Sequence, residues 1–146
     1  MCLYTHNMIA NVAEKDIICY KIMKTAVYSG LKTDGLFFSP YMNMGWEIGN
    51  EYDHDGANFE DLPLNYEHRT KLYKWENGFF HTFKSLTGAI YHTHWVNEHN
   101  TFGVPCVVMK CVIPKGTEYY EGDGAFNCYR EDGYASRNIK TVEVVH

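Results

Sequence analysis

The stretch WENGFFHTFKSLTGAIYHTHWVNEHNTFGVPCVVMKCVIP covers residues 75–114 and carries the strongest structural signals of the chain. Its first part, residues 78–83, follows an Asn-Gly turn and has the aromatic composition of a short strand. Ser85 then offers a hydroxyl oxygen to the free N–H groups of a helix, and apolar residues recur behind it at intervals of three and four. Residues 104–114 are apolar on both faces apart from one lysine, as in a central strand. We therefore predict one main amphipathic helix over residues 85–97, between two strands.

Two other segments have the pattern of strands. Residues 17–23 form a nearly continuous apolar run, which predicts an interior strand. Lys21 interrupts that run, and it fits either a side chain that snorkels to water at the strand end or a ligand-binding group. Residues 139–145 alternate strictly, and their charges predict a strand close to the sheet edge.

The segments between these elements lack sustained periodicity. Residues 41–74 contain three glycines and one proline, and we predict a long loop insertion there with a short strand near residues 46–48. Loops of that length are uncommon unless they carry a function, so this segment is the favoured place for a binding surface. We predict that residues 1–16 form an N-terminal arm. The expected whole is a single domain of residues 1–146 in the α+β class, with a mixed or mostly antiparallel sheet.

Composition excludes some classes of partner. The 146 residues carry a formal net charge of −5, which argues against binding to nucleic acid, because that binding depends on a basic surface. No apolar run approaches the roughly 20 residues that cross a bilayer, so no membrane association is expected.

The five cysteines include no Cys-x-x-Cys pair and no signal peptide pattern precedes them, which indicates a reduced, cytoplasmic compartment. The aromatic excess of 12 Tyr, 8 Phe and 3 Trp fits either a strand-rich core or a binding protein.

Acidic residues gather within residues 47–61, inside the predicted loop. Such a run is either a solvated loop or a surface that attracts a basic protein partner. On the second interpretation, the binding residues are aromatic and acidic side chains of this segment: Tyr41, Trp46, Glu47, Glu51, Tyr52, Asp53 and Asp55.

Histidines are the obvious candidates for a metal site, and four of them fall within nineteen residues. His92 and His94 diverge on a helix, and the i, i+4 spacing that suits zinc occurs only as His94 with Glu98. The sequence contains no phosphate-binding loop, serine-hydrolase elbow or His-Glu-x-x-His pattern. We therefore predict no metal site and, on the first hypothesis below, no cofactor.

Several short motifs together resemble a known group of proteins. They are Tyr20-Lys21, Phe38-Ser39-Pro40-Tyr41, Gly45-Trp46-Glu47-Ile48-Gly49, Gly78-Phe79-Phe80-His81, Ile113-Pro114-Lys115-Gly116-Thr117 with Tyr119-Tyr120 and Gly122, and Tyr134-Ala135-Ser136. This combination, which spans most of the chain, resembles a family of small uncharacterised proteins from bacteriophages and gut bacteria. The resemblance implies an accessory protein of a mobile element that acts in the cytoplasm of its bacterial host, and it implies no established activity.

The order of elements is also similar to the ADP-ribosyltransferase fold. The corresponding segments are Tyr20-Lys21, Phe79-Phe80-His81-Thr82, residues 107–113 and Glu131-Asp132-Gly133-Tyr134. That resemblance implies an NAD cofactor and catalytic candidates at Lys21, His81, Thr82 and Glu131. The chain departs from the family pattern at Lys21, where one class has arginine, and at Gly133, where the catalytic glutamate is expected.

Three hypotheses follow. The first is a phage-type accessory protein that binds a host protein through its aromatic and acidic surface without catalysis, for example as an inhibitor of a host or defence factor. The second is an NAD-dependent transferase with a divergent active site. On the third, the histidines and aromatic residues are structural, and His81 in its aromatic strand needs only a hydrogen-bond partner.

Overall fold

A computed structural model describes residues 2–5, 9–26, 35–40, 45–53, 58–61, 73–77, 79–126 and 129–146. Its helix is α1 (Leu86–Glu98). Its strands are β1 (Cys2–Thr5), β2 (Asn11–Val12), β3 (Ile17–Lys24), β4 (Phe37–Phe38), β5 (Gly45–Trp46), β6 (Glu51–Asp53), β7 (Asn58–Asp61), β8 (Tyr73–Asn77), β9 (Phe80–Phe83), β10 (Cys106–Ile113), β11 (Glu118–Phe126), β12 (Tyr129–Ser136) and β13 (Asn138–Val144).

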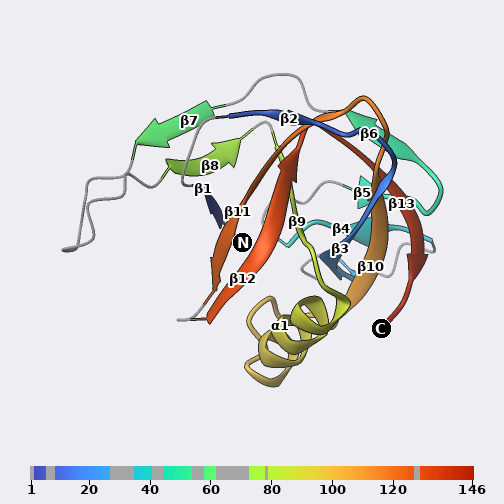
Figure 1. Ribbon diagram of the computed structural model, residues 1–146. Helices are drawn as coiled ribbons and strands as arrows, with labels where there is room; N and C mark the ends of the chain where they lie inside the picture. The colour runs from blue at the N-terminus through green and yellow to red at the C-terminus, as the bar shows by residue number, and fades with distance from the viewer. Residues whose placement is uncertain are drawn as a thin grey trace.

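The strands form one sheet in the order β6-β13-β10-β3-β9-β12-β11-β1-β8-β7. Strands β2, β4 and β5 join this path from the side, and every pairing among the described strands is antiparallel. Figure 1 shows that the sheet is strongly curved and that α1 lies below the strands in this view. The described part of the chain is thus a sheet-rich antiparallel fold with a single helix, which agrees with the α+β class in its loose sense.

Strands β3 and β10 are neighbours in the interior of the sheet. Eight residue pairs match them, from Cys106 with Lys24 to Ile113 with Ile17. Because side chains alternate along a strand, this register divides the core into two layers. Cys19 lies in one layer with Trp46 and Phe80. Val108 lies in the other layer, with the helix residue Ala89.

The structure confirms the helix that the sequence predicts and its capping residue Ser85. The Gly88 N–H donates to the Ser85 hydroxyl oxygen at 3.0 Å, which caps the first turn. At the other end, the Asn97 side chain binds both the N–H and the carbonyl of Cys106, at 2.8 and 2.9 Å. These two hydrogen bonds fix the end of α1 to the start of β10. Helix α1, the single helix of the described residues, is not long and apolar enough to cross a membrane.

Two predicted segments differ from the structure. The expected loop insertion of residues 41–74 contains β5, β6, β7 and part of β8. The expected arm of residues 1–16 contributes β1, which pairs with β8 and β11, and β2, which pairs with β11. These strands are short and gain stability from partners far away in the sequence, so local periodicity gave no signal for them.

Candidate functional site

The predicted binding residues fall into three groups in the structure. Glu47, Glu51 and Asp53 are exposed at the surface. Trp46 is 1% exposed, so it supports this surface from the core rather than forming part of it. Tyr52 is half-buried and contacts both the buried Trp46 and the exposed Glu47. The remaining two predicted residues, Tyr41 and Asp55, lie outside the described residues.

We call residues 47–53 the acidic turn. They comprise the connection that follows β5 and the strand β6 itself, and they carry three carboxylates. Aromatic rings pack beneath the turn. The ring centres of Trp46 and Tyr52 are 4.4 Å apart, and those of Trp46 and Phe80 are 5.2 Å apart in an edge-to-face arrangement. The Tyr52 hydroxyl also accepts a hydrogen bond from the Glu47 N–H at 2.7 Å. The turn is therefore joined to the main core by one cluster of aromatic rings.

Thr141, a fully buried residue of β13, holds the acidic turn from the side. Its hydroxyl donates to the Glu47 carbonyl and lies 3.2 Å from the Asn50 carbonyl. Its backbone N–H donates to Asn50 and its carbonyl accepts from the Gly49 N–H, both at 3.0 Å. Gly49 has a φ of 89°, which favours glycine in this bend. The turn thus has a fixed backbone.

The surface of the acidic turn combines charge with one apolar side chain. Ile48 is 49% exposed and follows Glu47 directly. The Glu47 carboxylate accepts a hydrogen bond from the Asn50 side chain at 2.9 Å, and among the described residues none of the three carboxylates forms an ion pair. Sequence reasoning did not single out Ile48 or Thr141; a threonine on the apolar side of a strand was the only signal for the latter.

A second group of polar side chains lies in the core layer beneath. Lys21 is in the middle of the interior strand β3 and its side chain turns into the core, so the first of the two alternatives, snorkelling to water at the strand end, is wrong. The Lys21 ammonium donates to the His81 carbonyl at 3.1 Å and lies 5.7 Å from the centre of the Trp46 ring. Although Lys21 as a whole residue is half-buried, burial lowers the pKa of its ammonium.

The neighbours of Lys21 in this layer are two thiols and a hydroxyl. Burial raises the pKa of Cys19 to about 12, and the adjacent Thr82 hydroxyl opposes part of that rise. Burial also raises the pKa of Cys111. Such thiols are poor nucleophiles, because the thiolate is the reactive form. Within the described residues the buried Trp46 N–H and Ser136 hydroxyl have no hydrogen-bond partner.

The four transferase candidates do not all face the same layer. Thr82 is buried in the same layer as Lys21. The side chain of His81 points to the opposite side of β9, as does that of Phe83, which packs toward α1. Burial, followed by the charge of Lys21, lowers the pKa of His81 to about 3, so its ring is neutral at physiological pH. Glu131 lies in β12, where its backbone pairs with Gly124 of β11, beyond the end of β9.

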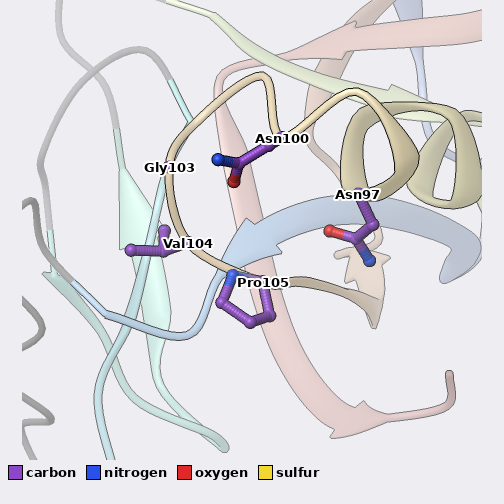
Figure 2. Close-up of a pocket in the computed structure, with 5 residues that line it drawn as sticks. All are labelled: Asn97, Asn100, Gly103, Val104 and Pro105. Atoms are coloured by element: carbon purple, nitrogen blue, oxygen red, sulfur yellow. The ribbon is translucent and has the colours of Figure 1, made fainter.

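A surface hollow of about 260 Å³ lies at the end of α1 and is shown in Figure 2. Asn97, Asn100, Gly103, Val104 and Pro105 line it. The Asn97 side chain already binds the backbone of Cys106 with its oxygen and its nitrogen. The hollow therefore offers few polar groups to a ligand.

Comparisons of the chain with protein-family models, with curated proteins and with solved structures find no match.

Proposed function

We propose that the chain is a non-catalytic, phage-type accessory protein whose acidic turn binds a basic surface of a host protein, for example to inhibit a host or defence factor. One observation carries the proposal. Three exposed carboxylates and a half-exposed isoleucine lie on a turn whose backbone is fixed by Thr141 and by the aromatic cluster of Trp46.

A fixed turn is suited to binding because little conformational entropy is lost when the partner docks. The carboxylates of Glu47, Glu51 and Asp53 attract a partner with lysines and arginines, and the net charge of −5 adds to that attraction. Ile48 supplies the apolar contact that ion pairs at a wet surface do not. The expected partner surface is therefore a shallow apolar spot with basic residues around it.

Charge reversal tests the proposal. Proteins from a bacterial host lysate that bind the immobilised chain are identified by mass spectrometry, and the affinity of the purified partner is then measured by calorimetry. In the triple variant Glu47→Lys, Glu51→Lys and Asp53→Lys, we expect the affinity to fall by at least about a hundredfold, since each lost contact at a charged interface costs roughly 1 kcal/mol or more. The loss is expected to shrink in high salt, which screens exposed charges.

The matched control reverses three exposed carboxylates elsewhere, at Glu14, Glu98 and Asp132. Both triple variants change the net charge equally. An equal loss of affinity in the control contradicts the proposal, because it means that overall charge rather than the acidic turn attracts the partner.

A second candidate function, an NAD-dependent transferase, rests on the polar side chains of Lys21 and Thr82 in one core layer. It predicts that NAD⁺ raises the melting temperature of the wild-type chain and that Thr82→Val abolishes this effect. The binding proposal predicts no change of melting temperature with NAD⁺ in either chain.

A further inference from the structure

Two histidine rings from different elements meet at the surface near the end of β13. His94 is on α1 and His146 follows β13, and Figure 1 shows this end of the chain beside the helix. The two Nε2 atoms are 3.2 Å apart. The ring centres are separated by 4.9 Å, with 58° between the ring planes. Both residues are exposed, so solvent reaches the pair.

The backbone on both sides of the pair is fixed. The Val108 N–H of β10 donates to the His146 carbonyl at 2.8 Å, and the Val145 N–H donates to the Val108 carbonyl at 2.9 Å. Val145 also packs against the buried layer that contains Ala89 of α1. The helix that carries His94 and the tail that carries His146 are thus joined through one cluster of side chains, which keeps the two rings together.

The separation of the two nitrogens fits a shared metal ion. An imidazole nitrogen binds Zn²⁺ at about 2.0–2.1 Å, so two imidazoles on a tetrahedral ion have their nitrogens about 3.3 Å apart. We propose that His94 and His146 bind one divalent transition-metal ion, such as Ni²⁺, Cu²⁺ or Zn²⁺, through their Nε2 atoms. Imidazole is a common ligand of these ions, and water or a group from another molecule occupies the remaining coordination positions.

The pair is a two-ligand site within the chain as described. The described residues include no group of three or more histidine, cysteine, aspartate or glutamate side chains placed to hold a metal. His92, two residues from His94, is 2% exposed and packs beside Phe83. An N–H···N hydrogen bond between the rings also spans 3.2 Å, and the experiment distinguishes this bond from metal binding.

The test uses the full chain without an affinity tag and titrates it with NiCl₂ in a calorimeter. We expect binding that weakens by at least about tenfold in both His94→Ala and His146→Ala, because each variant leaves a single imidazole. His99→Ala is the control, since His99 is also exposed on the same helix end but stacks on Trp95 at 4.2 Å. Its isotherm is expected to match that of the wild type.

A measurement without substitutions locates the ion. Paramagnetic Ni²⁺ at substoichiometric amounts is expected to broaden the ring-proton resonances of His94 and His146 before those of His99. The proposal is overturned if no heat is detected up to millimolar NiCl₂, if the isotherms of both alanine variants match that of the wild type, or if other histidines broaden first.

Discussion

At the scale of the residue, Lys21 is the least expected side chain. Within the described part of the chain, its ammonium has one hydrogen bond, to the His81 carbonyl, and one aromatic neighbour, Trp46. Among the described residues it has no carboxylate partner, and burial lowers its pKa. A charged group taken out of water with so few partners destabilises the folded state.

Replacing this lysine with an apolar residue of similar length is expected to stabilise the protein. Lys21→Met is predicted to raise the free energy of unfolding by about 1–2 kcal/mol at pH 7, since it removes the cost of burying the charge. Lys15→Met, at an exposed lysine, serves as the control and is expected to stay within about 0.5 kcal/mol. Urea denaturation measures both, and a destabilised Lys21→Met variant would contradict this account of the side chain.

The same residue gives a pH dependence. The pKa of Lys21 in the folded chain lies below its ordinary value of 10.5, so between these two values the unfolded chain holds the additional proton. The stability of the wild type therefore rises with pH through this window, relative to Lys21→Met. The stability difference between the two chains is expected to be largest at neutral pH and to shrink toward pH 10. A difference that stays constant with pH would mean that the pKa of Lys21 is the same in the folded and unfolded chains, so that burial does not lower it.

At the scale of the element, sequence signals worked where structure is local. Ser85 and the apolar spacing behind it specify α1 within one segment, and the apolar runs of β3 and β10 each predicted an interior strand, although not their pairing. The two-residue strand β5 and the three-residue strand β6 are different. Their stability comes from Trp46 in the core and from Thr141 on a strand about 90 residues later, which periodicity does not reveal.

The anchoring of the acidic turn by β13 is testable through Thr141. Thr141→Val keeps the shape of the side chain but removes the hydroxyl, so the Glu47 carbonyl loses this donor. We expect a loss of about 1–2 kcal/mol in the free energy of unfolding. Faster hydrogen exchange is also expected in the acidic turn. Thr141→Ser retains the hydroxyl and is expected to keep the slow exchange; if both variants exchange alike, the hydroxyl does not anchor the turn.

At the scale of the whole molecule, the acidic turn lies at one end of the strand order, because it includes the edge strand β6. Acidic side chains on a short edge strand discourage the addition of another strand. The partner is therefore expected to contact the side chains of the turn rather than to extend the sheet. Composition alone gave the sign of the charge and the acidic segment, but it did not separate the buried Trp46 from the exposed carboxylates, because that distinction depends on packing between distant strands.

Zero-length carbodiimide cross-linking of the complex with its purified partner tests the central claim most directly. The reagent joins a carboxylate only to an amine that touches it, and mass spectrometry identifies the linked residues. The account predicts cross-links from Glu47, Glu51 or Asp53 to lysines of the partner. Cross-links that involve only other carboxylates, such as Glu14 or Glu98, would contradict it.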